Sequence, residues 1–357
     1  MKNYPVFDGH NDTLLKLMRL GASSIEQFLH GNLDAHIDRV RAKSTGYRGA
    51  FFAVFTPSKK SISQSGSRTM LPAQHALKPD MSPIPRSHAV NFTNDTINLL
   101  HRIIGLSKGT IALINKAEDL KTFTQVPGLS IILHLEGAEA IDARFNNLQR
   151  YYKKGLRSLG LVWSRRNIFG SGVSLDFPGS PDVGPGLSEY GIELVKRCNQ
   201  LGIILDLAHL NEKGFWDVAR LSVKPLVVSH AGIHRLCPSP RNLSDRQLEA
   251  IANSNGITGI TFANGLIRAD GRIDLSATLN DIIDHIDYIR KHFGIDYVGF
   301  GSDFDGARIA EQLGDVTGIL KLIEKLEERG FTEHELRKIC YANWLRVIKE
   351  TLASHRC

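Results

Sequence analysis

Three features of the 357-residue sequence predict an α/β fold, a distorted (β/α)8 barrel of the TIM type, formed by a single domain over residues 1–357. Short apolar segments alternate with amphipathic segments along nearly the whole chain, as βα units require. Several of these segments are apolar almost throughout, which is typical of parallel strands buried on both faces. Eight strands with intervening helices suit a barrel of about this length. A doubly wound open sheet shows the same alternation and is the alternative fold.

Each expected strand is a short run rich in aliphatic and aromatic residues. In chain order they are Tyr4–Asp8, Gly49–Phe55, Leu129–Leu135, Leu156–Val162, Ile203–Leu207, Pro225–Val228, Ile257–Phe262 and Tyr297–Gly301. Two of the helices begin with a capping box, Ser244 with Gln247 and Thr332 with Glu335.

The segment 56–88 departs from this pattern because it is rich in Ser, Pro and Lys and has no regular period. We expect an irregular insertion there. It is either a surface loop or a lid over the barrel mouth, since loops that follow strands build the active sites of such barrels.

The composition excludes several classes of protein. Hydrophobic residues make up 42% and charged residues 23% of the chain, which excludes a largely disordered protein. The 44 Lys and Arg exceed the 37 Asp and Glu, but they are scattered, so we expect no nucleic-acid partner. We expect no membrane association, because no apolar run approaches about 20 residues and the N-terminus lacks an apolar signal region. Four cysteines without a C-x-x-C pair indicate a reducing compartment, so a cytoplasmic location is expected.

Candidate metal ligands stand where expected strands end. His10 and Asp12 follow the first strand, and residues two apart on an extended chain point to the same side, so both can bind one ion. Glu136 ends the third strand, where a carboxylate can bridge two ions with its two oxygens. His134 and Glu139 are the neighbouring alternatives to Glu136.

Two further histidines, His209 and His230, end the fifth and sixth expected strands. Together with His10, Asp12 and Glu136 they form a set of nitrogen and oxygen ligands without a thiolate. Such a set suits a hydrolytic zinc site, or a site for another borderline divalent ion. The sequence therefore predicts a barrel of the metal-dependent hydrolase type.

A general acid or base is expected at the end of the eighth strand, where Asp303 and Asp305 follow Gly301. Both aspartates would share a face of an extended chain. The residues alone therefore do not choose between them.

Several of these motifs together resemble the membrane (renal) dipeptidase family of zinc metallopeptidases, as a soluble bacterial-type member. They are Asp8–Asp12, Glu136–Gly137, Leu205–His209, Ser229–Asn242, Gly301–Gly306 and Tyr341–Val347. They follow the family's order from residue 5 to about residue 350. The resemblance implies a dipeptidase that hydrolyses the peptide bond of small dipeptides, including L-Xaa-D-Xaa forms, and that forms a homodimer.

The resemblance also implies a binuclear zinc site, which other divalent metals can occupy. His10 and Asp12 would bind one ion, His209 and His230 the other, and Glu136 would bridge them. A hydroxide shared by the two ions would be the nucleophile.

Three further residues take roles by the same resemblance. Asp303 matches the acid/base that passes a proton to the leaving amine, and Arg241 matches the arginine that holds the terminal carboxylate of the substrate. Trp163 stands where renal-type members carry a histidine that contacts the substrate carbonyl. An indole N–H donates a hydrogen bond but carries no charge.

The departure at Trp163 has two consequences. Arg165, Arg166 or Asn167 could supply the missing donor. A hydrolase of another small amide, lactam or ester is the alternative function, and a non-catalytic binding protein is disfavoured because all five ligands and Asp303 are present.

Overall fold

The computed structural model describes residues 4–58, 80–125, 128–273 and 277–353. These residues form nine strands, and neighbouring strands pair in parallel. The strands are β1 (Val6–Asn11), β2 (Tyr47–Phe55), β3 (Ile111–Leu113), β4 (Leu129–Glu136), β5 (Leu156–Gly160), β6 (Ile204–Asp206), β7 (Val227–Ala231), β8 (Ile257–Ile260) and β9 (Val298–Phe300).

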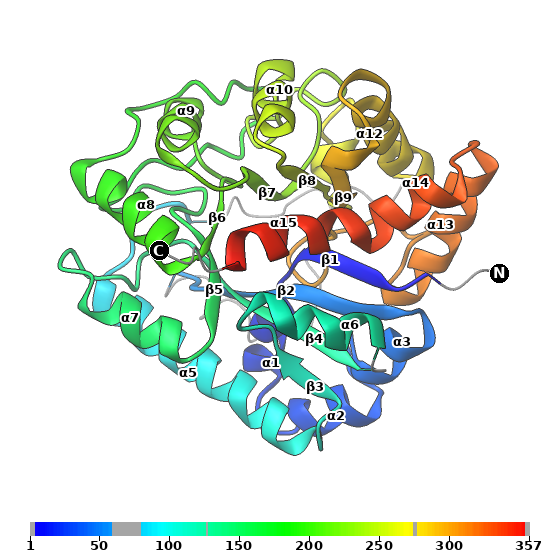
Figure 1. The fold of residues 1–357 in the computed structure, drawn as a ribbon, viewed down its shortest axis with the longest axis horizontal. Coiled ribbons are helices and arrows are strands. Elements are labelled where there is room, and N and C mark those ends of the chain that lie inside the picture. The colour runs from blue at the N-terminus through cyan, green and yellow to red at the C-terminus, as the bar shows by residue number, and fades with distance from the viewer. Residues whose placement is uncertain (1–3, 59–79, 126–127, 274–276, 354–357) are drawn as a thin grey trace.

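Eight of these strands close into a barrel, which confirms the predicted fold. Apart from β3, the strands follow one another around the ring in chain order, and β9 pairs with β1. The pairing of β2 with β4 completes the ring, so the open doubly wound sheet is excluded. The ring is seen end-on in Figure 1. All eight predicted strands are present, with ends shifted by a few residues.

The ninth strand, β3, was not predicted from the sequence. It is three residues long, too short to show a hydrophobic period. It pairs with the first residues of β4, on the edge that β5 occupies further along the same strand. It therefore extends the sheet at one end of the barrel without entering the ring.

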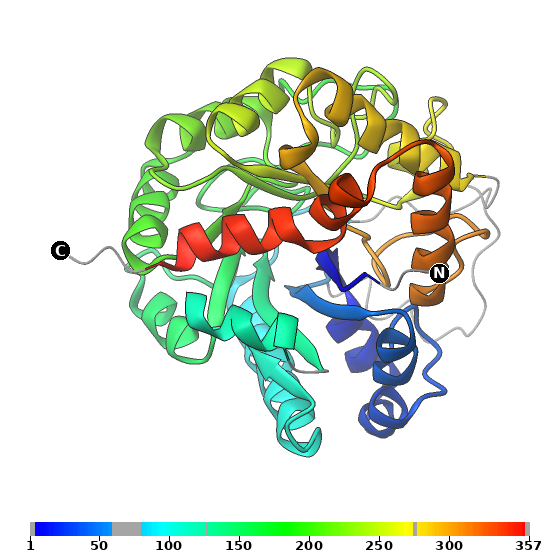
Figure 2. The ribbon, with the colours of Figure 1, turned by 45° about the vertical axis from the view of Figure 1, so that its right-hand side comes forward.

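Helices surround the ring on its outer side (Figure 2), as the alternating pattern predicts. They are α1 (Thr13–Leu20), α2 (Ser24–His30), α3 (Arg39–Ser44), α5 (Arg86–Leu106), α6 (Leu120–Gln125), α7 (Asn146–Lys153), α8 (Glu189–Leu201), α9 (Glu212–Leu221), α10 (Asp245–Asn253), α11 (Asn264–Ile267), α12 (Leu279–His292), α13 (Ile319–Glu328), α14 (Glu333–Arg337) and α15 (Asn343–Leu352), with the short turns η2 (Ala117–Asp119), η3 (Ile295–Tyr297), η4 (Val316–Gly318) and η5 (Lys338–Ala342). Both predicted capping boxes are present, at the starts of α10 and α14.

The insertion expected at 56–88 falls largely outside the described residues, because 59–79 are not among them. The lid interpretation concerns that part of the chain. Of the remainder, residues 80–85 are irregular and α5 begins at Arg86, so the irregular segment ends before residue 88.

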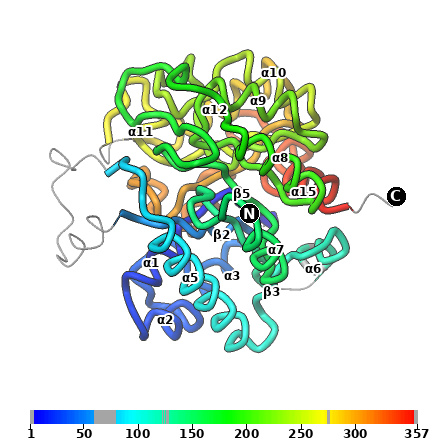
Figure 3. Tube along the Cα trace, turned by 90° about the vertical axis from the view of Figure 1, so that its left-hand side faces the viewer, coloured from blue at the N-terminus to red at the C-terminus, as the bar shows by residue number. Residues whose placement is uncertain are grey.

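The N-terminal end of the barrel is closed by α15, which lies across the ring of strands in Figure 1. Trp344 of this helix is fully buried, and its indole N–H donates to the carbonyl of Phe300 at 2.9 Å. Gly9 and Gly299 leave room for the indole, because a Cβ at either position would lie within 2.6 Å of its ring. Figure 3 shows α15 and α11 at opposite ends of the barrel.

The expectations of no membrane association and of reduced cysteines concern the helices and the thiols of the described residues. Within the described residues, no helix combines the length and the apolar character that crossing a bilayer would need. Cys198, Cys237 and Cys340 are buried free thiols.

Candidate metal centre and active site

The residues singled out from the sequence gather at the C-terminal end of the barrel, around a cavity of about 460 Å³. His10 lies in β1, Glu136 ends β4, and His230 lies in β7. The other members stand in the segments that follow strands, and the structure brings all of them to this end. Seven of the eight line the cavity, namely Asp12, Glu136, Trp163, His209, His230, Arg241 and Asp303. His10 lies behind them and is fully buried.

The five candidate ligands form two groups that share Glu136. In the first group, His10 Nε2 lies 3.5 Å from Asp12 Oδ2 and 3.8 Å from Glu136 Oε1. In the second, Glu136 Oε1 lies 2.9 Å from His209 Nε2 and 3.7 Å from His230 Nε2. Glu136 Oε1 therefore lies close to a histidine of the first pair and to both histidines of the second.

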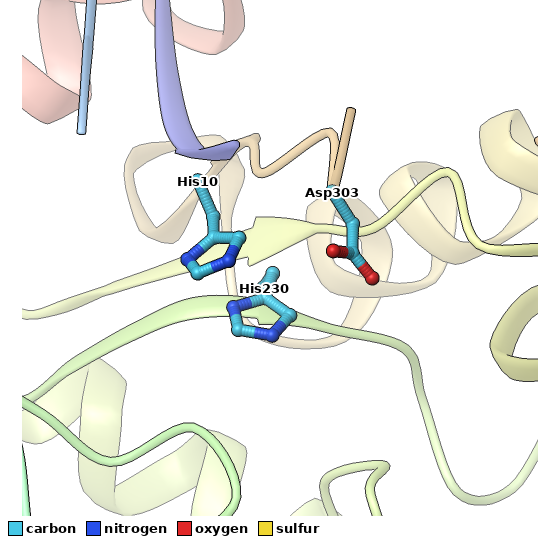
Figure 4. A group of neighbouring side chains, drawn as sticks. All are labelled: His10, His230 and Asp303. Carbon is cyan, nitrogen blue, oxygen red and sulfur yellow. The ribbon is translucent and has the colours of Figure 1, made fainter. Parts of the chain in front are cut away.

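Asp303 joins this cluster from the segment after β9. Figure 4 shows the imidazoles of His10 and His230 one above the other, with the Asp303 carboxylate directed toward them. The two rings are stacked with centroids 3.9 Å apart. Ligand atoms of these three residues lie within 4.8 Å of one another, so Asp303 can reach a group held by the histidines.

Buried aspartates of two strands, β1 and β6, fix the backbone that carries the ligands. Asp8 of β1 accepts from Ser302 N at 2.7 Å and from the Tyr47 hydroxyl at 2.7 Å, which ties β1 to the segment that holds Asp303. Asp206 of β6 accepts in the same way from Ser229 N at 2.8 Å. Each aspartate thus links neighbouring strands directly behind the cluster.

Serine hydroxyls orient the two histidines of the second group. Ser229 Oγ donates to Asp206 Oδ2 at 2.6 Å, so its oxygen accepts from His230 Nδ1 at 2.8 Å. The proton of His230 therefore sits on Nδ1, and Nε2 offers its lone pair to the centre. Ser164 lies 2.7 Å from His209 Nδ1 in the equivalent position.

The role of these serines was not predicted from the sequence. Ser229 precedes His230 directly, but Ser164 and His209 are 45 residues apart. No local spacing signals that contact, because it depends on β5 and β6 being neighbours in the barrel.

The two alternatives to Glu136 have other partners. His134 points into the barrel, where Nδ1 lies 3.0 Å from Ser158 Oγ and Nε2 lies 3.4 Å from Asp206 Oδ2. Glu139 accepts from Arg165 Nε at 2.7 Å. Neither belongs to a group of ligand atoms that could hold an ion among the described residues.

The two aspartates after β9 do not share a face, contrary to the expectation from an extended chain. Both have positive φ, 61° at Asp303 and 66° at Asp305, so the segment turns instead of continuing as a strand. The Asp305 carboxylate accepts from Thr13 Oγ1 at 2.8 Å and from His36 N at 2.7 Å. Asp303 alone is directed at the histidines.

The electrostatics of the cluster favour additional positive charge. Burial raises the pKa of Glu136 well above its usual value, and burial also raises the pKa of Asp303 to about 7. Burial lowers the pKa of His10, but the nearby carboxylates of Glu136 and Asp12 outweigh it, and the pKa rises to about 10. Burial and the charge of Arg241 lower the pKa of His209 well below its usual value. Crowded, desolvated carboxylates that hold a proton on His10, beside the neutral imidazoles of His209 and His230, are a natural cation site.

Buried polar atoms without hydrogen-bond partners indicate whether these residues fit a metal ion. Both ring nitrogens of His10 and Oδ1 of Asp12 are buried without a hydrogen-bond partner among the described residues. Buried polar groups are normally paired, so such atoms call for a partner that the protein alone does not supply. The donor set of imidazole nitrogens and carboxylate oxygens fits zinc and similar divalent ions.

Arg241 and Trp163 contact different histidines of the cluster. Arg241 is 4% exposed, and its Nη2 donates to the carbonyl of His230 at 3.1 Å. The Trp163 ring lies 5.7 Å from the His209 ring and 5.0 Å from the Phe55 ring. A cationic group therefore lies beside His230, and an aromatic wall of Trp163 and Phe55 lies beside His209.

Apolar residues that were not predicted from the sequence also line the cavity, among them Leu175, Phe177, Leu266 and Ile273. These residues come from the segments after β5 and β8, whose irregular composition gave no periodic signal. The Phe177 ring packs directly on Gly271, where a Cβ would lie 2.3 Å from it.

A closed parallel barrel with histidines and carboxylates gathered at the C-terminal ends of its strands defines a class, the metal-dependent (β/α)8 hydrolases. Within that class, a sequence profile of the membrane dipeptidase family, peptidase family M19, matches residues 1–356. The chain belongs to this family, which confirms the resemblance read from its motifs and makes it a dipeptidase-type metallopeptidase.

Relatives and solved structures agree with this assignment. The chain is 45% identical over 251 residues to an uncharacterized Klebsiella pneumoniae protein from the 5′ region of pqqA, covering 70% of this chain and 93% of the relative. The crystal structure of the M19 metallopeptidase dipeptidase AC is 40% identical with a TM-score of 0.91, covering 99% of this chain and 100% of that one. A metallopeptidase from Rhodobacter sphaeroides is also 40% identical with a TM-score of 0.91, covering 98% and 100%.

Proposed function

We propose that this chain hydrolyses the single peptide bond of small dipeptides, including those with a D-residue at the C-terminus, at a site that holds two zinc ions. The observation that carries the proposal is the position of Glu136 between two pairs of ligands, His10 with Asp12 and His209 with His230. A carboxylate shared in this way is typical of two-metal hydrolytic sites.

The protein groups each have a defined task under this proposal. His10, Asp12, His209, His230 and Glu136 would hold the ions, with His230 presented through Nε2 by Ser229. When bound, the ions would supply a nucleophile from water at neutral pH and polarise the scissile carbonyl. The protein contributes the ligands and the cavity at the C-terminal end of the barrel, while α15 closes the N-terminal end.

Asp303 suits the proton transfer. Burial raises the pKa of this carboxyl group in the metal-free cluster, and a carboxyl group held beside the ligands can take up a proton and release it to a leaving amine. Its position beside His10 and His230 (Figure 4) supports this role, because a substrate held at the cluster would bring its reacting bond near this carboxylate. We assign it delivery of a proton to the leaving amine.

Arg241 suits the substrate's terminal carboxylate. The guanidinium is buried in the cavity wall, and no carboxylate lies within salt-bridge distance of it among the described residues. A buried cation without an ion pair favours an anionic ligand. This requirement selects dipeptides with a free C-terminus.

The solved relative from Rhodobacter sphaeroides supports the choice of substrate, because that protein was crystallised with a phosphinate mimic of the dipeptide L-Ala-D-Ala. At 40% identity with essentially full coverage of both chains, a similar substrate class is expected here.

Amine release from a panel of L-L and L-D dipeptides tests the proposal. Zinc-reconstituted protein should cleave members of the panel, and a chelated sample should cleave none. Silence across the panel with zinc verifiably bound would contradict dipeptidase activity and direct attention to other small amides, lactams or esters.

A further inference from the structure

We propose that Arg165 is a second substrate-binding arginine, which donates a hydrogen bond to the carbonyl oxygen of the scissile peptide bond. This inference rests on the proposed dipeptidase function. It assigns a role to a cavity residue that the metal cluster and Arg241 leave unexplained.

Arg165 is held rigidly in the wall of the cavity. It follows β5, lines the same cavity as Glu136 and Trp163, and has a side chain that is 0% exposed. Its Nε donates to Glu139 Oε1 at 2.7 Å, and its Nη2 donates to the carbonyl of Thr56 at 2.8 Å. Two bonds to different segments fix the plane of the guanidinium, so little conformational entropy remains to be lost on binding.

One nitrogen of the Arg165 guanidinium makes no hydrogen bond within the described residues. Nη1 of Arg165 is buried and has no hydrogen-bond partner within the described part of the chain. The guanidinium carbon lies 5.2 Å from the centroid of Trp163 and 5.4 Å from that of Phe55. Aromatic rings stabilise the cation but do not satisfy its N–H donors. Because an unpaired buried donor is costly, a ligand oxygen entering the cavity gains by pairing with it.

The charge balance indicates a carbonyl oxygen as that partner. Glu139 neutralises Arg165 through a direct ion pair, whereas Arg241 has no such partner among the described residues. A neutralised guanidinium remains a strong directional donor but has no net charge to attract a carboxylate. The two arginines therefore divide the substrate, with the carboxylate at Arg241 and an uncharged peptide oxygen at Arg165.

The location of Arg165 agrees with this division. Ser164, its neighbour in sequence, lies 2.7 Å from His209 Nδ1, and the Trp163 ring packs beside the same histidine. Arg165 thus follows directly on two residues that lie beside His209, whereas Arg241 lies in the segment after β7 and donates to the carbonyl of His230. A carbonyl whose oxygen gains negative charge during attack would be stabilised most by a preorganised donor there.

Replacing Arg165 with Met tests the proposal, and Arg157→Met is a matched control. Arg157 lies at the start of β5, the strand that Arg165 follows. It is 8% exposed and donates to the carbonyls of Asn115 at 2.6 Å and Tyr152 at 2.9 Å. Like Arg165 it stacks on an aromatic ring, but it lies away from the metal cluster.

With zinc-loaded protein and a dipeptide that the native enzyme cleaves, Arg165→Met should lower kcat/KM by about a hundredfold, mainly through kcat, as loss of one oxyanion donor does. Its zinc content should stay native. Arg157→Met should lower the melting temperature but leave kcat/KM within about twofold. Arg165→Lys retains the positive charge but loses the planar guanidinium, so its kcat/KM should lie between those of the native protein and Arg165→Met. This conservative variant keeps the test valid if Arg165→Met fails to fold.

Two measurements separate binding from a structural role. Added guanidinium ion should restore part of the activity of Arg165→Ala. Calorimetric binding of a phosphinate dipeptide mimic should weaken at least about tenfold in Arg165→Met. Native kcat/KM in Arg165→Met, or a loss that follows zinc content and is not rescued by guanidinium, would overturn the inference while leaving the dipeptidase proposal intact. A native enzyme that cleaves no dipeptide would overturn both.

Discussion

The two ends of the barrel are built from the same ring of strands but differ in polarity, since one end is apolar and the other carries ionisable side chains. At the N-terminal end, Phe7, Phe51, Ile132, Ile257 and Trp344 form a buried apolar cluster. At the C-terminal end lie histidines and carboxylates, and atoms of His10 and Asp12 have no hydrogen-bond partner within the described residues. This barrel therefore separates stability from chemistry along its axis, as is usual for the fold.

A single strand illustrates the division. Along β1, Phe7 joins the apolar cluster, Gly9 admits the Trp344 indole, and His10 reaches the ligand cluster. Asp8, between them, is fully paired with Ser302 and Tyr47. If the division is real, substitutions at one end should alter metal binding and turnover, and substitutions at the other should alter unfolding alone.

The largest effect is expected from Glu136→Gln. The amide keeps the shape but loses the charge that faces both ligand pairs, so retention of both ions should fail and kcat/KM should fall by about a thousandfold or more. Metal analysis after dialysis measures the first and dipeptide cleavage the second. Native zinc content in this variant would remove Glu136 as the bridge.

At the opposite end, Trp344→Ala should lower the free energy of unfolding by about 3–5 kcal/mol, because it empties a fully buried indole site and removes the bond to Phe300. Denaturant unfolding measures the loss. Zinc content and kcat/KM of the remaining folded protein should be native, and a parallel loss of zinc would show that the two ends are not independent.

Asp303→Asn should leave zinc bound and lower kcat by about a hundredfold, since an amide cannot transfer the proton. Asp305→Asn is the matched control two residues away. Its carboxylate pairs with Thr13 and His36, so this variant should change stability more than turnover. Equal losses of kcat in both variants would contradict the assignment of Asp303.

The smallest effect is expected from Ser229→Ala, which removes the hydroxyl between Asp206 and His230. Zinc affinity should fall by about tenfold, because His230 is no longer held with Nε2 toward the centre. A zinc competition titration measures this change. Unaltered affinity would show that the backbone alone orients His230.

Much of this arrangement could be predicted from the sequence, because strand ends are marked by buried apolar runs. His10, Glu136 and His230 were placed correctly at one end of the barrel for that reason. Motif order within the family then suggested Arg241 and Asp303 as partners in one cavity.

What could not be predicted depends on tertiary geometry. The alternation of side chains along a strand put Asp303 and Asp305 on one face, but positive φ at both residues separates them. The contact between Ser164 and His209, and the pairing of Arg165 with Glu139, join segments from different strands. The three residues of β3 carried too little pattern to be recognised.

The central claim is a shared two-ion site that cleaves dipeptides, and a zinc titration of metal-free protein tests it most directly. Bound zinc and the rate of L-Ala-D-Ala hydrolysis should be measured on the same samples. The structure predicts that both rise together and level off at two equivalents per chain, since Glu136 couples the pairs of ligands. Full activity at one equivalent, or two bound equivalents without cleavage of any dipeptide, would contradict it.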